Sequence, residues 1–211
     1  MSRNRRRREF EKRLMRRLSG GFVRLFVEKG VSPLHLTYSA FALSLFASAL
    51  YAFSGTYLYL TVLAAVALLA SAFLDALDGE VARLSSRVTR LGAFLDSMLD
   101  KIAEASVCLG IAFSGLVEGY VVLLFCASSL LVGYARARAE GVGVDLAGVG
   151  IAERAERIII LSTASLIAPL HPQVLAAALY LGSILSLITV ALRVFRVAAA
   201  LRGEGGQVHK A

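Results

Sequence analysis

The feature that most constrains the fold is a long run of the chain without charge. Between Gly30 and Leu74 there is no Asp, Glu, Lys or Arg. A Ser-Gly-Thr triplet at 54–56 divides this run into two apolar segments, approximately 34–53 and 57–77. About 20 apolar residues are enough for a helix to cross a bilayer. Together with a hydrophobic composition of 57%, this predicts a protein that spans the membrane several times.

The rest of the chain contains further candidate spans. We expect four of them, at about 91–115, 119–135, 151–170 and 174–195. The first of these carries four charged residues and is the weakest by hydropathy, so its acids must face a water-filled cavity or the bundle interior. The predicted fold is therefore an all-α integral membrane protein with six transmembrane helices. Residues 31–200 would form this domain, and the polar residues 201–211 a disordered tail.

The N-terminal segment, residues 1–30, is strongly basic, with eleven Lys or Arg against three Glu. Its apolar residues recur at helical spacing among those charges: Phe10, Leu14, Leu18 and Phe22, with Met15 and Leu25 nearby. This pattern predicts an amphipathic helix in the headgroup layer that binds anionic membrane lipids. A solvated basic tail is the alternative for residues 1–8. The adjoining spans favour lipid over nucleic acid as the partner of these charges.

The basic residues also predict the orientation. Three short loops, near 54–57, 116–118 and 169–173, contain no Lys or Arg, and the regions on the other side hold 22 of the 23. Because basic loops stay in the cytoplasm, both termini and every candidate chemical group are expected at the cytoplasmic face. Four tyrosines near the opposite ends of the spans are expected to be interfacial anchors: Tyr51, Tyr57, Tyr59 and Tyr120.

Four aspartates lie where two of these segments meet. Asp75 and Asp78 are three residues apart, and Asp96 and Asp100 are four apart, so on helices each pair shares one face. Four acids near a bilayer need cations or protons to offset their charge, and Mg²⁺ and Mn²⁺ prefer such oxygen ligands. Arg83 adds a planar group suited to phosphate. A solvated acidic hairpin, or a cation or proton transporter, could use the same acids.

The full pattern over residues 75–100 resembles a known signature. It reads D-x2-D-G-x2-A-R-x8-G-x3-D-x3-D, and it is similar at every fixed position to that of the CDP-alcohol phosphatidyltransferase family. Upstream, many members have an Asn after the proline of a short entry motif that ends in Thr, and here that position is Leu34 and the final residue Thr37.

The resemblance implies an enzyme that displaces CMP from a CDP-linked lipid with the help of two Mg²⁺ or Mn²⁺ ions, and that forms a homodimer. It assigns the metal site to Asp75, Asp78, Asp96 and Asp100. It also makes Asp100 the general base for the attacking alcohol. The residues expected to contact the CDP group are Asp75, Gly79, Ala82, Arg83 and Gly92.

A second cluster of arginines bears on the acceptor. It comes from the ends of three apolar segments and consists of Arg136, Arg138, Arg154, Arg157, Arg193 and Arg196. Such a cluster suits an acceptor that carries its own phosphate. The strings YARARAEGVG and GIAERAERIII resemble the phosphatidylinositol-phosphate and archaetidylinositol-phosphate synthase branch, which implies inositol phosphate. By that resemblance the first choices for the acceptor phosphate are Arg136, Arg154 and Arg193, and the near-equivalent alternatives are Arg138, Arg157 and Arg196. Glycerol 3-phosphate would use the same cations, and each arginine alone could be a membrane anchor.

Overall fold

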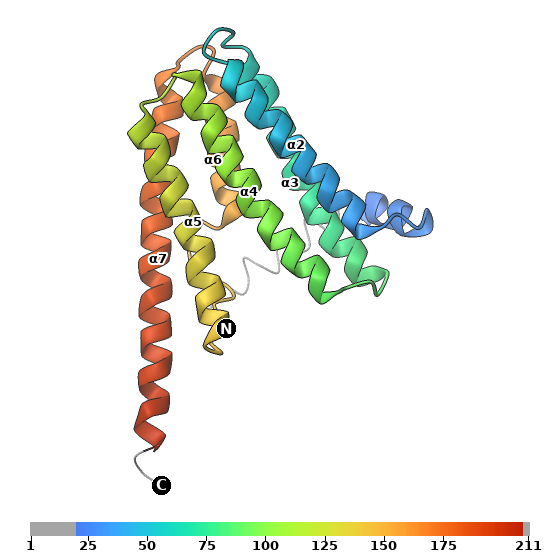
Figure 1. Ribbon diagram of the computed structural model, residues 1–211, viewed down its shortest axis with the longest axis vertical. Coiled ribbons are helices and arrows are strands. Elements are labelled where there is room, and N and C mark those ends of the chain that lie inside the picture. Colours follow the sequence, from blue (N-terminus) through green and yellow to red (C-terminus); the bar gives the residue numbers. More distant parts are fainter. Residues whose placement is uncertain (1–19, 209–211) are drawn as a thin grey trace.

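A computed structural model of the protein describes residues 20–208, with side chains through Arg202. This part of the chain is helical and contains no strand. After a short helix at residues 20–28, the long helices are α2 (Pro33–Phe53), α3 (Leu60–Leu84), α4 (Arg90–Ser114), α5 (Gly119–Gly141), α6 (Arg154–Ile167) and α7 (Gln173–Val208) (Figure 1). Each of the six apolar segments expected from the sequence corresponds to one of them.

Four of these helices are long and apolar enough to cross a membrane: α2, α3, α5 and residues Gln173–Arg202 of α7. The chain is thus an integral membrane protein by the character of its helices. The other two long helices differ for identifiable reasons. Five of the 25 residues of α4 are charged, and α6 has only 14 residues.

Local sequence signals explain where several helices begin and end. α2 begins at Pro33, whose fixed φ and missing N–H suit the first turn of a helix. α4 begins after Thr89, whose hydroxyl accepts a hydrogen bond from the Gly92 amide at 3.0 Å. It ends at Gly115, which adopts a left-handed conformation with φ 69°.

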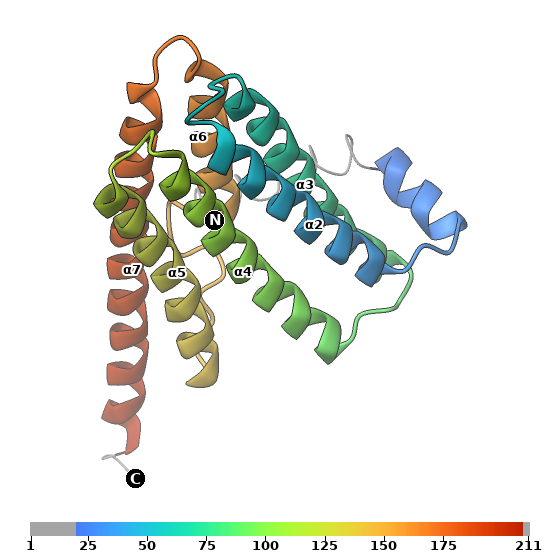
Figure 2. The same ribbon diagram turned by 45° about the horizontal axis from the view of Figure 1, so that its top comes forward.

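The helices pack as two groups that lean together at one end. α2 packs against both α3 and α4, while α5 packs against α7; α6 contacts α3 and α7, and α4 contacts α5 (Figures 1 and 2). Gly110 permits the close approach of α4 to α2, because a Cβ there would lie 2.2 Å from the Ser48 carbonyl oxygen. A continuous apolar core, including Tyr51, Ile111 and Leu179, joins the two groups.

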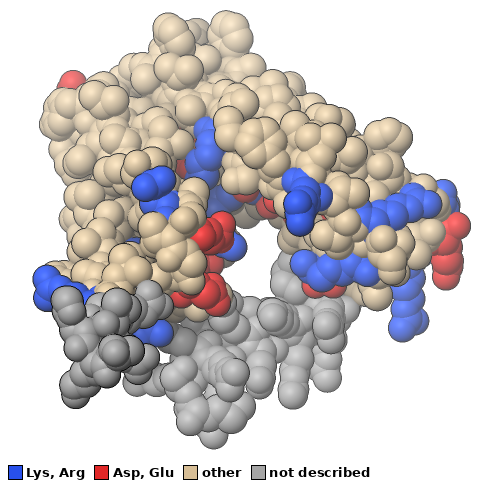
Figure 3. All heavy atoms as spheres, turned by 60° about the horizontal axis from the view of Figure 1, so that its bottom comes forward, with Lys and Arg blue, Asp and Glu red and all other residues tan. Residues whose placement is uncertain are grey.

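The two ends of the molecule differ in charge. The three loops without Lys or Arg gather at the end where the helix groups converge (Figure 2). At the other end the groups diverge, and Lys, Arg, Asp and Glu surround a hollow between them (Figure 3). The charge asymmetry along the sequence therefore becomes an asymmetry between the ends of the fold.

Tyr51 differs from the expectation that it is an interfacial anchor. It is fully buried, and its hydroxyl shares a 2.7 Å hydrogen bond with Ser165 of α6. That prediction is wrong, because a position near a span end does not tell which side of the helix faces the core. Tyr57, Tyr59 and Tyr120 are exposed.

The terminal segments are described only in part. Phe10, Leu14, Met15 and Leu18 of the predicted amphipathic helix lie outside the described residues. Within residues 20–28, Val23 is buried against Leu36, Leu77 and Val81, whereas Phe22 is 52% exposed and meets Phe73 edge-on.

At the other end, α7 continues to Val208. Helix thus extends into the 201–211 segment, and the disorder that we expected for this segment stays a prediction. Residues 209–211 lie outside the described part of the chain.

Candidate active site

Three of the four signature aspartates converge between α3 and α4. Asp75 and Asp78, one turn apart on α3, and Asp96 of α4 each offer an oxygen, and these oxygens lie within 4.8 Å of one another. Helical spacing brings Asp75 and Asp78 to one face, and the turn at 85–89 returns Asp96 toward them. Several carboxylate oxygens at such separations match the ligand preferences of Mg²⁺ and Mn²⁺. The donor set therefore fits a hard divalent cation.

Asp78 is held by a residue from a third helix. It is only 7% exposed, and its Oδ2 accepts a 2.6 Å hydrogen bond from the Thr37 hydroxyl of α2. Sequence reasoning did not assign a role to Thr37, although it is the final residue of the entry motif.

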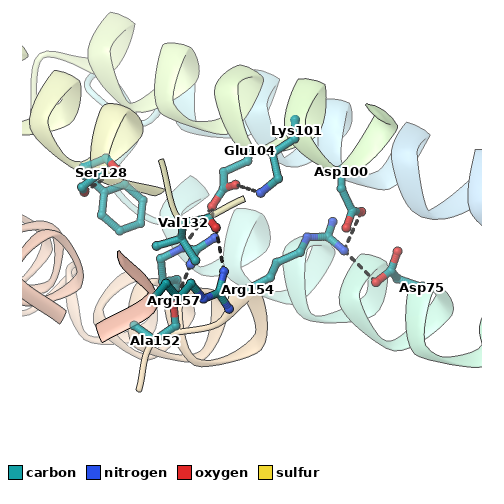
Figure 4. A network of polar contacts seen from close by, with 11 residues as sticks. Asp75, Asp100, Lys101, Glu104, Ser128, Val132, Ala152, Arg154 and Arg157 are labelled. Atoms are coloured by element: carbon teal, nitrogen blue, oxygen red, sulfur yellow. Dashed lines mark hydrogen bonds and ion pairs between the residues drawn. The ribbon is translucent and has the colours of Figure 1, made fainter. Parts of the chain in front are cut away.

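Asp100 shares a cationic partner with Asp75. Its Oδ1 lies 2.7 Å from Nη1 of Arg154, and the same nitrogen lies 2.7 Å from Oδ2 of Asp75 (Figure 4). Arg154 is the first residue of α6. It thus joins α6 to both α3 and α4, and Asp75 belongs to both the three-oxygen group and this ion pair.

Arg157, one turn further along α6, is part of a buried network. Its guanidinium donates to Glu104 of α4 at 2.6 Å and 3.0 Å and to the Ala152 carbonyl at 2.8 Å (Figure 4). Lys101 donates to the same Glu104 at 2.7 Å. Glu104 and Lys101 were not predicted as a pair with Arg157. An acid and a base three residues apart in an apolar helix are a signal that could have suggested it.

Arg193 of α7 is also turned inward. It is 3% exposed, and it donates to the backbone carbonyls of Val149 at 2.9 Å and Val132 at 2.6 Å. Nearby, the Thr189 hydroxyl accepts from the amides of Ile151 and Ala152, both at 3.1 Å. These contacts attach the loop between α5 and α6 to α7. Because Arg154 directly follows that loop, these contacts position its side chain beside the carboxylates.

The remaining predicted arginines are exposed at the same end of the molecule. Arg136 pairs with Glu140 at 2.9 Å, and Arg138 lines a groove between α5 and α7. Arg196 lies on the surface of α7. Among the residues that the structure describes, Arg154 alone of the six predicted arginines has an ion pair with a signature aspartate.

The other signature positions lie close to the carboxylates along α3 and at the start of α4. Arg83 is 62% exposed and pairs with Glu80 at 2.9 Å. A Cβ at Gly79 would lie 3.6 Å from the Arg83 guanidinium. At Gly92 a Cβ would come within 2.9 Å of the Thr89 hydroxyl, so this glycine also keeps the N-cap of α4 free.

Comparison with known proteins identifies the family. The sequence model of the CDP-alcohol phosphatidyltransferase family matches residues 31–195, and the chain belongs to this family. It is 43% identical over 166 residues to the archaetidylinositol phosphate synthase of Pyrococcus horikoshii, covering 79% of this chain and 83% of that protein. It is also 43% identical over 167 residues to the protein of the same name from Methanothermobacter thermautotrophicus, covering 77% and 81%.

Solved structures give the same result for the fold. The phosphatidylinositol phosphate synthase of Mycobacterium tuberculosis with CDP-DAG bound superposes with a TM-score of 0.71 and 26% identity, covering 86% of this chain and 94% of that one. The same protein in complex with manganese and citrate has a TM-score of 0.70, with 26% identity, covering 84% and 87%.

Proposed function

We propose that the protein transfers the phosphatidyl-type group of a CDP-linked lipid to an inositol phosphate and releases CMP. The observation that carries this proposal is the meeting of three carboxylates and Arg154 at one end of the bundle: a cation site lies directly beside a group that can bind phosphate. The names of the related proteins from Pyrococcus and Mycobacterium support the inositol phosphate acceptor. The donor would be CDP-diacylglycerol or CDP-archaeol.

Mg²⁺ or Mn²⁺ would be held by Asp75, Asp78 and Asp96, with Asp100 completing the site. The oxygen-only donor set and the manganese in the Mycobacterium structure support this assignment. When bound, the ions supply positive charge that polarises the phosphorus under attack and stabilises the departing CMP oxygen.

The other signature residues would orient the donor. Gly79 and Ala82 leave space for the cytidine along α3, Arg83 carries an exposed guanidinium for the diphosphate, and Gly92 allows close approach at the start of α4. The acceptor hydroxyl then forms a bond to the β-phosphorus while the bond from this phosphorus to the CMP oxygen breaks. Asp100 takes the hydroxyl proton.

The acceptor phosphate would be bound by arginines from α5, α6 and α7. Arg154 is our first choice, because it lies beside the carboxylates and is 21% exposed. Arg136, Arg138 and Arg196 have exposed side chains at the same end. Arg157 and Arg193 could reach a phosphate only by giving up partners in the buried contacts described above, although both remain candidates from the sequence.

We further propose that all six long helices span the bilayer, with the N-terminal residues 1–30 as an interfacial helix on anionic lipids. Residues 31–200 form the catalytic domain, and the carboxylate end and both termini are cytoplasmic. The charge difference between the two ends supports this orientation. In a variant with Cys108 and Cys126 replaced by Ala, Cys at Thr56 should react with an impermeant maleimide in intact spheroplasts. Cys at Val142 should react only after lysis, and the reverse pattern would invert the topology.

Dimerisation is expected from the family and remains a proposal for this chain. Light scattering of the detergent-purified protein should give twice the chain mass after subtraction of detergent. A monomeric mass at all concentrations would contradict it.

The decisive experiment is CMP release by purified protein with Mg²⁺ and each CDP-lipid in turn. Inositol 1-phosphate, free inositol, glycerol 3-phosphate and serine are offered separately. We expect release only with inositol 1-phosphate. Release only with glycerol 3-phosphate would keep the metal site and change the acceptor, and release with serine or free inositol would make the arginines membrane anchors.

A cation or proton transporter is the second candidate, favoured only by its shared need for intramembrane acids. Asp75 and Asp78 lie in the second half of α3, toward its charged end. This position favours the enzyme, since transporter sites lie near the midplane. No CMP release with any acceptor from folded protein would favour the transporter.

A further inference from the structure

Asp75 has two competing roles in this structure. One of its oxygens belongs to the group of three that fits a divalent cation, and its Oδ2 lies 2.7 Å from Nη1 of Arg154. The same nitrogen lies 2.7 Å from Asp100 (Figure 4). Arg154 therefore neutralises part of the charge that a metal ion would neutralise.

The Arg154 guanidinium should lower the affinity of these aspartates for a divalent cation, and the cation should weaken their ion pairs with Arg154. Both are positive, both use Asp75, and the space around them is enclosed by Thr37, Leu99 and Ala103 as well as the two aspartates. Charges that are partly removed from water repel more strongly than exposed ones. The metal thus binds more easily if Arg154 has another anion to contact.

Arg154 is free to change partners in a way that its neighbour is not. Its side chain is 21% exposed, and it contacts the two aspartates that a metal could take over. Arg157, by contrast, is 3% exposed and bound to Glu104 and the Ala152 carbonyl. Moving Arg157 would leave a buried carboxylate without its partner, which is costly.

We propose that Arg154 couples the binding of the metal to the binding of the acceptor. Without ligands it holds Asp75 and Asp100 together, and an acceptor phosphate draws it away so that the carboxylates bind the metal more tightly. By thermodynamic reciprocity the metal raises the affinity for the acceptor by the same factor. This inference rests on the proposed function, because it takes the acceptor to carry a phosphate.

The test measures Mn²⁺ affinity rather than turnover. Free Mn²⁺ is followed by electron paramagnetic resonance while the purified full chain is titrated without CDP-lipid, with and without saturating inositol 1-phosphate. A titration without protein corrects for Mn²⁺ bound by inositol 1-phosphate. We expect the acceptor to lower the Mn²⁺ Kd of the wild type by about tenfold, within the usual range of coupling between sites.

Substitutions at Arg154 then test whether this residue causes the change in Mn²⁺ affinity. Arg154→Gln should bind Mn²⁺ more tightly than the wild type without acceptor, and inositol 1-phosphate should no longer change its Kd. Arg87→Gln is the matched control: it removes the same charge at the same end, and the Arg87 guanidinium donates to the Gly30 carbonyl rather than to a signature aspartate. It should keep the wild-type coupling.

Arg154→Lys is a second variant in case the glutamine protein does not fold. It retains the charge between the helices, but the shorter side chain cannot hold both carboxylates as arginine does. Its coupling should be weaker than that of the wild type.

Two results would overturn the inference and leave the proposed function intact. One is a wild-type Mn²⁺ Kd that inositol 1-phosphate does not change, and the other is wild-type coupling in the Arg154 variants. If the folded wild type binds no Mn²⁺ at all, the metal site and the inference both fail.

Discussion

At the scale of single residues, the signature aspartates are not equivalent. Asp78 is buried and held by Thr37, Asp75 and Asp96 are partly exposed, and Asp100 faces Arg154. Four aspartates of one sequence signature therefore have different surroundings in the fold. Asp100 lies outside the three-oxygen group, which suits the role of proton acceptor that we propose for it.

Asp100→Asn tests this division of roles. Asparagine keeps an oxygen that can accept from Arg154 but cannot take a proton, so we expect turnover to fall by about 10²–10⁴-fold. Binding of Mn²⁺ and CDP-lipid should be partly retained. Steady-state CMP release and equilibrium binding measure the two effects, and wild-type turnover would refute the base assignment.

Thr37→Val tests whether the hydrogen bond to Asp78 orients a metal ligand. The change preserves shape but leaves the buried carboxylate without its donor. Loss of such a supporting contact typically weakens metal binding by about 10–100-fold. Thr61→Val is the control, since Thr61 is buried in α3 far from the aspartates and donates to the Leu58 carbonyl. Equal Mn²⁺ affinity in both variants would mean that Thr37 only packs.

At the scale of elements, the loop between α5 and α6 determines where Arg154 lies. Backbone groups of Val149, Ile151 and Ala152 are bound by Arg193 and Thr189 of α7. Gly150 adopts φ 137°, and a Cβ there would come within 2.5 Å of Thr189. The glycine-rich loop between α5 and α6 is thus fixed to α7 by these hydrogen bonds.

Thr189→Val should destabilise this attachment. It preserves side-chain volume but leaves two amides without their acceptor, which costs about 1–3 kcal/mol per buried group. Thermal unfolding in detergent should shift down by several degrees, and the 142–153 loop should become more sensitive to protease. Thr163→Val, at an exposed position of α6, is the control. Equal unfolding temperatures would show that water replaces the hydroxyl.

At the scale of the whole molecule, buried and partly buried ion pairs connect α6 to α3 and α4 near the hollow. Arg154 joins α6 to α3 and α4, and Arg157 joins α6 to Glu104 of α4. The groups otherwise diverge at this end (Figure 1). The ion pairs of Arg154 and Arg157 therefore also connect the helices that surround the candidate site.

A double-mutant cycle measures this connection. Glu104→Gln leaves Arg157 buried without its charge partner and should lower the free energy of unfolding by about 3–5 kcal/mol. Arg157→Met should cost much less in the Glu104→Gln protein than in the wild type, because the pair is already broken. Additive effects in denaturant unfolding would contradict a direct coupling.

The sequence by itself determined the helical membrane class, the helix positions and the family. Uncharged runs and a spaced signature carry that information locally, since span length and helical periodicity depend only on neighbouring residues. The grouping of Asp75, Asp78 and Asp96 was likewise predictable from a hairpin of two helices. Which of the six arginines meets the acids was not, because Arg154 and Arg157 lie one turn apart with similar neighbours. The packing of α6 between α3 and α7 places Arg154 beside the aspartates and Arg157 beside Glu104. Contacts between residues so far apart in the chain produce no periodic pattern in the sequence, so only the tertiary structure reveals them.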